Sequence, residues 1–244
     1  MAEREGREQA VRALIDLEPT TPEHGDGLTG WLARLCSAAV RALPASGAGV
    51  SVVDQHGVTG LAAANDAESE YLEELQFTLG EGPCVDALAA RRPVLEPNIE
   101  TGAMARWPMY APAVLGRGVQ AVFAFPLQVG AARLGVLDVY RRQPAGLGEG
   151  ELALALTFAD VAVSKLLDVQ AGLESGAQPD ALDAMMSYRT ELYQAQGMVM
   201  VDLGTTVAEA MVRMRAYAFA NERRLSEVAR DIVAGRLRLD TDGT

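Results

Sequence analysis

Apolar residues recur at steps of three and four in the last quarter of the chain, and this spacing predicts three short helices. The first spans about Ala181–Leu203 and ends at Gly204, a residue type that favours helix C-termini. The second opens on Thr206-x-x-Glu209, a capping box that satisfies two backbone N–H groups. The apolar positions are Val207, Ala210, Met211, Met214 and Ala218 in the second helix, and Leu225, Val228, Ala229, Ile232, Val233 and Leu237 in the third. Three amphipathic helices of this kind can bury a small shared core.

The chain ahead of these helices mixes helical spacing with strand-like alternation. An amphipathic helix is predicted from Leu28 to Leu43, and a weaker one over residues 1–18. Hairpins are predicted at 48–64 and 119–142, followed by a long helix over 149–168. Between the hairpins we expect a short polar helix at 66–76, a turn into a helix at 80–88, a strand at 93–96, and loop and helix over 98–118. Pro126, inside the second hairpin, indicates a sheet edge or a bulge. Hairpins flanked by helices favour an α+β domain with an antiparallel sheet.

Length and composition narrow the protein class. A chain of 244 residues is long enough for one large or two ordinary domains. It has no apolar run of the length that a transmembrane helix needs, and its first residues lack the apolar core of a secretory signal. Two cysteines do not make a disulfide framework in a chain of this size. We therefore expect a cytoplasmic protein with no membrane association.

Charge is distributed unevenly along the chain. The formal net charge is −12, yet residues 189–238 hold eight arginines against six acidic residues. An acidic protein with a locally basic segment is a poor non-specific binder of nucleic acid but can be a selective one. Arginine suits bidentate contacts with phosphates and bases. Genome composition could also produce this preference for arginine over lysine.

Ordered motifs in the C-terminal helices resemble the ANTAR domain, an RNA-binding output module of bacterial transcription antiterminators. They are Ala195-x-Gly197-Met198-x-Met200, the Thr-x-x-Glu-Ala entry to the second helix, Arg213-x-Arg215-x-x-Ala218 and Leu225-x-x-Val-Ala229. The resemblance covers about 188–237 and implies a three-helix, all-α domain that binds structured RNA with hairpin loops. Many members have lysine where this chain has Gln196, so this position supplies no cation for a phosphate.

The preceding region resembles a GAF domain, a small sensory module, over about 27–168. Its clearest local motif is Leu79-Gly-Glu-Gly-Pro-Cys84, supported by Arg106-Trp-Pro108 and Val122–Leu127. The combination is similar to actinobacterial proteins that pair GAF with ANTAR and act as transcription antitermination regulators. We therefore expect a GAF-like domain over 27–170, a linker over 171–179 and an ANTAR domain over 180–239. GAF domains bind many different small ligands or none, so the fold alone names no ligand.

Candidate RNA-binding residues follow from the ANTAR resemblance and from charge. They are Gln196, Gly197, Arg213, Arg215, Arg223, Arg224 and Arg230. The alternative is a solvated face on which the arginines pair with Glu209, Glu222 and Glu227. Tyr217 and Phe219 are either core residues or platforms on which looped-out bases stack.

Two helices carry heptad-like rows that suggest a homodimer. One row is Leu152, Leu156, Ala159, Val163, Leu166 and Leu173; the proposed seam of the other is Leu182, Arg189, Leu192, Gln196 and Val199. The alternative is that this apolar stripe packs within one chain.

The sensory half offers two candidate pocket residues, Cys84 and Trp107, for an unidentified small ligand. Cys84 is expected near a helix N-terminus, where it is either a packed thiol or a redox sensor. His24 and His56 lack a second ligand nearby in sequence, so we predict no metal site and no cofactor. No nucleophile–base or paired-carboxylate arrangement stands out, so we do not expect an enzyme. The alternative function is a dimeric signalling or scaffold protein whose C-terminal helices bind another protein.

Overall fold

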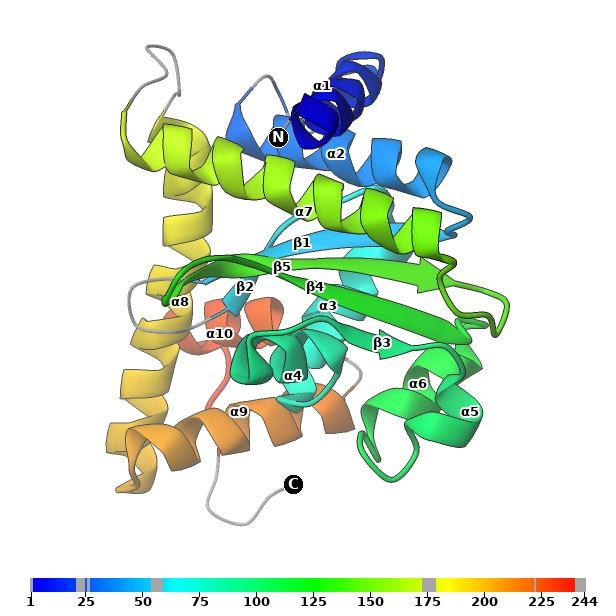
Figure 1. Ribbon diagram of the computed structural model, residues 1–244. Helices are drawn as coiled ribbons and strands as arrows, with labels where there is room; N and C mark the ends of the chain where they lie inside the picture. The colour runs from blue at the N-terminus through cyan, green and yellow to red at the C-terminus, as the bar shows by residue number, and fades with distance from the viewer. Residues whose placement is uncertain are drawn as a thin grey trace. The chain divides into compact units, whose positions relative to one another are not determined.

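The computed structural model in Figure 1 describes residues 2–20, 25, 27–53, 59–172, 179–221 and 223–239. It divides into two compact units, Met1–Phe77 with Glu81–Ala181, and Thr78–Gly80 with Leu182–Thr244. Over 179–189 only the backbone is described. Among the described residues, no helix combines the length and the apolar character needed to cross a membrane.

The first unit is built on one antiparallel sheet with the strand order β2-β1-β5-β4-β3. The predicted hairpins form its two halves: β1 (Gly47–Val53) with β2 (Thr59–Ala64), and β4 (Ala121–Val129) with β5 (Ala132–Arg141). The short strand β3 (Val94–Glu96) pairs with β4 at the edge. β1 and β5 join the hairpins, and nearly all their residues are buried because helices cover both faces of the sheet.

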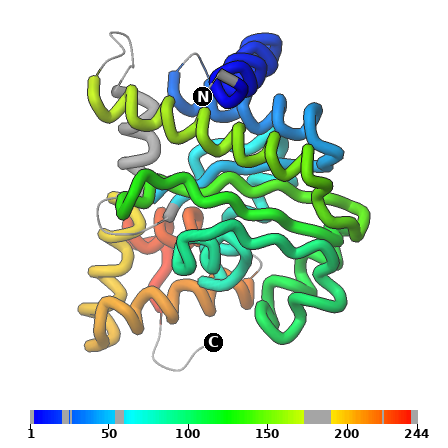
Figure 2. The backbone as a smooth tube through the Cα atoms, viewed as in Figure 1, coloured from blue at the N-terminus to red at the C-terminus, as the bar shows by residue number. Residues whose placement is uncertain are grey.

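Helices on the two faces come from different parts of the chain (Figure 1). One face carries α2 (Leu28–Ala42) and α7 (Glu149–Gln170), and α1 (Ala2–Asp16) packs on both. The other face carries α3 (Ala67–Leu79) and α4 (Pro83–Ala90). Figure 2 follows the chain from β3 through α5 (Ile99–Gly102) and α6 (Tyr110–Gly116) back to β4. The weakly amphipathic α1 is held by two side chains, Val11 and Ile15, both of which are buried.

Pro126 lies in the part of β4 that is paired with β5 but no longer with β3. β3 pairs with β4 only at Val122–Ala124. At Pro126, β5 is therefore the one strand of the described chain that pairs with β4, and no strand on the β3 side needs an N–H group from Pro126. The β4–β5 register also shifts between Leu127 and Gln128. Both features agree with the edge or bulge expected from the sequence, because proline cannot donate to a sheet ladder.

The second unit contains three helices, α8 (Pro179–Leu203), α9 (Val207–Ala220) and α10 (Leu225–Val233). The capping box is confirmed: Glu209 N donates to Thr206 Oγ1 (3.2 Å), and Thr206 N donates to Glu209 Oε2 (3.0 Å). Gly204 follows α8 with φ +61°, the left-handed conformation that glycine adopts without strain. The shared core consists of Leu192, Ala195, Val199, Ala210, Met214, Ala218, Leu225, Val228, Ala229 and Ile232. The predicted class, an α+β domain followed by an all-α domain, is confirmed.

Candidate functional site

A cluster of polar side chains is buried on the sheet face that α3 and α4 cover. We call it the buried cluster; it comprises Ser51, Glu73, Gln76, Cys84, Tyr110, Asp138 and Tyr140, none more than 4% exposed. Its members come from β1, α3, α4, α6 and β5. Buried carboxyl groups are rare unless they are paired, so this cluster is the feature of the first unit that packing alone does not explain.

Hydrogen bonds tie the buried cluster together. Tyr140 Oη and Ser51 Oγ each donate to Glu73, to Oε1 and Oε2 respectively, both at 2.7 Å. Gln76 Nε2 donates to Asp138 Oδ2 (2.9 Å), while Gln76 Oε1 accepts from Cys84 N (2.7 Å). Gln76 therefore joins β5 to the first turn of α4, where it satisfies a backbone N–H that the helix itself leaves unpaired.

Two glycines make room for these contacts. A Cβ added at Gly49 of β1 would lie 2.5 Å from Glu73 Cγ, and one at Gly82 would lie 2.5 Å from Gln76 Oε1. Gly82 also has φ +137°, a conformation that side chains rarely adopt. The close approach of α3 to the sheet and to α4 therefore depends on the absence of a side chain at both positions.

Burial dominates the electrostatics of the buried cluster. It raises the pKa of Asp138 well above the usual carboxyl range, and the neighbouring Glu73 raises it further. Burial also raises the pKa of Glu73, although the hydrogen bonds from Tyr140 and Ser51 oppose the shift. The pKa of the Cys84 thiol is raised well above its ordinary value, first by burial and then by the Asp138 and Glu73 charges. The thiol is thus neutral at ordinary pH, unlike the low-pKa thiolates of redox sensors.

Two acidic residues close to Cys84, Glu81 and Asp86, position the start of α6 and the loop that contains Arg106 and Trp107. Glu81 Oε1 accepts from the backbone N–H groups of Met109 (2.6 Å) and Tyr110 (2.7 Å), and so fixes the start of α6. Asp86 Oδ2 accepts from Trp107 Nε1 (3.0 Å) and from Arg106 Nε (2.6 Å).

Both predicted pocket residues therefore lie in the same region, in different roles. Cys84 belongs to the buried cluster, whereas the buried Trp107 anchors the loop before α6 and packs edge-on against Tyr110, with ring centroids 6.1 Å apart. Sequence reasoning missed Glu73, Gln76, Asp138 and Tyr140, which are dispersed along the chain.

The predicted RNA-contacting arginines of the second unit divide by their partners. Arg223 pairs with Asp231 (2.6 Å) and Glu227 (3.7 Å), and Arg230 lies 3.7 Å from Glu191. Arg215 and Arg224 are half-buried. Arg213 is exposed and forms no ion pair or hydrogen bond with any residue that the structure describes.

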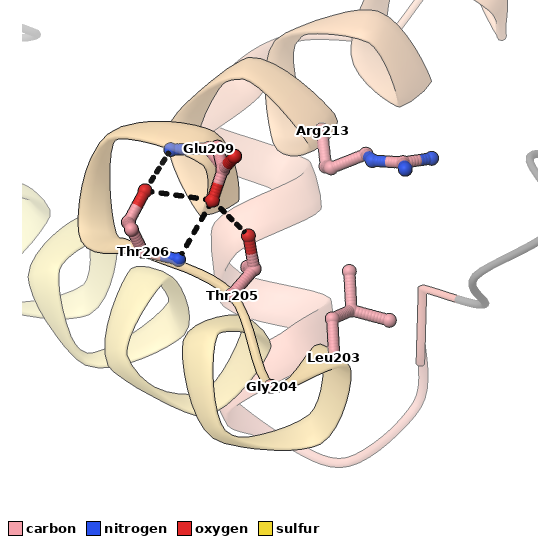
Figure 3. A pocket seen from close by; sticks show the side chains of 6 residues that line it. All are labelled: Leu203, Gly204, Thr205, Thr206, Glu209 and Arg213. Atoms are coloured by element: carbon pink, nitrogen blue, oxygen red, sulfur yellow. Dashed lines mark hydrogen bonds between the residues drawn. The ribbon is translucent and has the colours of Figure 1, made fainter.

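Arg213 borders an open hollow of about 470 Å³ at the turn from α8 to α9, lined also by Leu203, Gly204, Thr205, Thr206 and Glu209 (Figure 3). Figure 3 shows the Arg213 side chain extending away from the Glu209 carboxylate, which is held by Thr205 and Thr206. These hydrogen bonds, first that of Thr205, lower the pKa of Glu209 to about 2. Glu209 is therefore held mainly by the capping box, with a smaller contribution from the Arg213 charge, and the Arg213 side chain is exposed.

A second hollow, of about 410 Å³, lies between α8 and the end of α10. Gly197 lines it, and a Cβ at this position would meet nothing within 4 Å. The exposed Arg238 lines it as well; it follows the last predicted motif, which is why the sequence did not single it out. Gln196 is instead buried, and its Nε2 donates to Val207 O (2.7 Å), so this side chain holds the first turn of α9.

The proposed dimer seam on α8 lies largely inside its own unit. Leu192 and Val199 are 0% and 2% exposed, and Gln196, which is also buried, donates a hydrogen bond to Val207 O of α9. These three side chains follow the within-chain alternative. Leu182 and Arg189 lie outside the residues whose side chains are described.

Comparison with family models matches residues 27–164 to the GAF domain, which is more than half of the chain. The chain belongs to the GAF domain family. Residues 180–233 match the ANTAR domain, over the three helices of the second unit. GAF and ANTAR domains are typically regulatory, and their pairing supports a sensory regulator with an ANTAR output domain.

Solved structures show the same fold for the GAF part. The GAF domain of a phosphoenolpyruvate-protein phosphotransferase from Coxiella burnetii is 16% identical, with a TM-score of 0.53 over 69% of this chain and 95% of that one. The corresponding domain from Acinetobacter is 14% identical, with a TM-score of 0.51 over 69% and 96%. None of the curated proteins matches the sequence. At these identities the likeness establishes the fold alone.

Proposed function

We propose that this GAF–ANTAR protein is a signal-responsive transcription antitermination regulator that binds structured RNA with hairpin loops. The ANTAR domain binds the RNA, and the GAF domain senses a small ligand or mediates dimerisation. The observation that carries the proposal is the ANTAR match over all three helices of the second unit. The working boundaries are 27–170 for the GAF domain, 171–179 for the linker and 180–239 for the ANTAR domain. A regulator of nascent transcripts works in the cytoplasm.

The ion pairs of the ANTAR domain indicate which of its arginines contribute most to RNA binding. RNA phosphates bind cations whose charge is not already neutralised, and Arg213 and Arg238 have no ion pair within the described chain. Arg223 is paired with two carboxylates and contributes less. Phe219 is 41% exposed at the end of α9, where it can stack on an unpaired base. Gly197 lines the second hollow and has no side chain, so the RNA backbone can approach the helix closely at this position.

RNA binding is tested with the full-length protein. Hairpin RNAs with randomised loops are selected on it, and the affinity of the best hairpin is measured by fluorescence anisotropy at several salt concentrations. Affinity should fall as salt rises, because binding releases counterions from the phosphates. Arg213→Ala should weaken binding and flatten the salt slope by about one unit. The matched control is Arg12→Ala, which removes the same charge from an exposed position of α1 in the other unit.

One outcome would reverse the proposal. If no hairpin is selected, or if affinity does not depend on salt, the ANTAR domain of this chain does not bind RNA through phosphates. Val201 and Val212 are exposed on α8 and α9, so the alternative is then a dimeric signalling or scaffold protein whose C-terminal helices bind another protein.

We also propose that the protein is a homodimer. Because the α8 row is buried, the interface is better supported on α7, where Leu156 and Leu167 are 42% and 38% exposed. Sedimentation at micromolar concentration should give a mass near twice 25.9 kDa. A monomer both with and without RNA contradicts this proposal.

A further inference from the structure

The buried cluster contains an arrangement that RNA binding does not use. One carboxylate oxygen each from Glu73 and Asp138, together with Cys84 Sγ, lie within 4.8 Å of one another. Within the described chain no arginine, lysine or histidine pairs with either carboxyl group. Two acids and a thiol thus converge in a buried region with no cation to balance them, which is costly unless protons or a metal ion supply the positive charge.

We propose that Glu73, Cys84 and Asp138 form a binding site for a zinc ion. The site deepens the sensing half of the proposed function: the GAF domain would respond to a divalent metal ion. Its chemistry does not depend on the ANTAR domain or on RNA.

Unpartnered atoms point to a ligand independently of the acidic residues. Tyr110 is fully buried, and its Oη has no hydrogen-bond partner; the same is true of Asp138 Oδ1. Burial, and then the charges of Asp138 and Glu73, raise the pKa of Tyr110, whose hydroxyl also interacts with Tyr140, the donor to Glu73. Buried polar atoms are almost always satisfied, so two orphaned oxygens in the buried cluster need an explanation, and a metal ion on Asp138 accounts for one of them.

The spacing of the three donor atoms suits a single metal ion. Tetrahedral zinc with bonds of about 2.0–2.3 Å places its ligand atoms about 3.3–3.8 Å apart. Donors that lie up to 4.8 Å apart need to approach one another by at most about 1.0–1.5 Å, which side-chain rotation can supply.

The donor types favour zinc over harder cations. Magnesium and calcium prefer oxygen ligands alone, whereas zinc accepts thiolate and carboxylate together. A bound zinc ion would deprotonate the Cys84 thiol despite its buried environment. Tyr140 and Ser51 on Glu73, and Gln76 on Asp138, are the supporting hydrogen bonds that orient metal-binding carboxylates.

Zinc content tests the site directly. The full-length protein is expressed in zinc-supplemented medium, and metal per chain is measured by plasma mass spectrometry. Metal-free protein is then titrated at equilibrium with Co²⁺, whose thiolate complexes show a charge-transfer band. We expect one zinc per chain and a thiolate–cobalt band in the wild type. Cys84→Ser and Asp138→Asn should each weaken binding by about tenfold or more, as loss of even a supporting group can cost this much.

Cys36→Ser is the matched control. Cys36 is the other buried cysteine of the same unit, and its thiol contacts Ala63 O instead of the cluster. It should leave zinc content and the cobalt band unchanged. The proposal is overturned if natively folded wild-type protein binds neither metal, or if folded Cys84→Ser retains the band. If Cys84→Ser does not fold, the cobalt spectra of the wild type and of Cys36→Ser decide. A thiolate–cobalt band in both proteins supports the site. The proposal is refuted if the wild type shows no band, or if Cys36→Ser loses it. No RNA is present, so failure here is distinct from failure of RNA binding.

Discussion

Removing the Gln76 side chain tests whether the buried cluster holds the first unit together. Gln76 is 1% exposed, and its amide makes two short hydrogen bonds, to Asp138 on β5 and to the Cys84 backbone on α4, and a longer one to Tyr140 Oη (3.4 Å), which is also bonded to Glu73. In Gln76→Ala, Asp138 Oδ2 and Cys84 N remain buried while their hydrogen bonds to Gln76 are lost. We expect this single substitution to destabilise the first unit strongly.

The magnitude follows from the two groups left unsatisfied. Each buried polar group that loses its partner costs about 1–3 kcal/mol, so Gln76→Ala should cost about 2–6 kcal/mol. This is a large share of a total stability of about 5–15 kcal/mol. Gln76→Met keeps most of the side-chain volume but loses both hydrogen bonds, and should cost nearly as much.

Urea unfolding followed by tryptophan fluorescence measures the change in the free energy of unfolding of the first unit. The two tryptophans, Trp31 and Trp107, both lie in the first unit, so the signal reports on it even if the ANTAR domain unfolds separately. A chelator keeps the protein metal-free. The matched control is Gln120→Ala, an exposed glutamine of the same unit, which should change stability by about 0.5 kcal/mol or less.

Two results would refute the reasoning. A loss below about 1 kcal/mol in Gln76→Ala would mean that other groups satisfy Cys84 N and Asp138. Recovery of wild-type stability in Gln76→Met would assign the cost to packing instead of hydrogen bonding.

Three further outcomes are expected. Gly49→Ala should destabilise by about 1–3 kcal/mol because its Cβ would lie 2.5 Å from Glu73 Cγ, whereas Gly116→Ala, with nothing within 4 Å, should be tolerated; equal urea midpoints would contradict this. Glu209 should titrate near pH 2 when followed by NMR. Because its folded pKa is depressed, its capping contribution to stability is present above the unfolded pKa of 4.5 and is lost as the pH falls towards 2. A titration near 4.5 would show that the capping hydrogen bonds do not hold the carboxylate. In metal-free folded protein, Cys84 should resist mild peroxide because burial raises its thiol pKa; rapid sulfenic acid formation, read by mass spectrometry and abolished by unfolding, would identify a redox sensor.

Local features were readable from the sequence because they depend on residues a few positions apart. The Thr206–Glu209 capping box spans three residues, and its geometry was recovered in both directions. The helix predicted from Leu28 ends at Ala42, next to the predicted end at Leu43. Both hairpins were also predicted, since alternation and turns act over short segments.

Tertiary structure alone decided which helix faces are covered and by what. The α8 row containing Leu192 and Val199 fitted either a dimer or a single chain, and both side chains are buried within the single chain. Likewise, the motif at Cys84 was recognisable, but the role of Glu81 depends on Met109 and Tyr110, which lie 28 and 29 residues further along.

The buried cluster shows this division most clearly. The sequence predicted a short polar helix over 66–76, and a glutamate in such a helix usually faces water. Glu73 is buried because Gly49 lets α3 approach the sheet, and because Asp138 and Tyr140, more than sixty residues later, lie on the facing strand. Residue spacing records which face of an element is apolar, whereas the neighbour that meets its polar positions is determined only when distant strands pair.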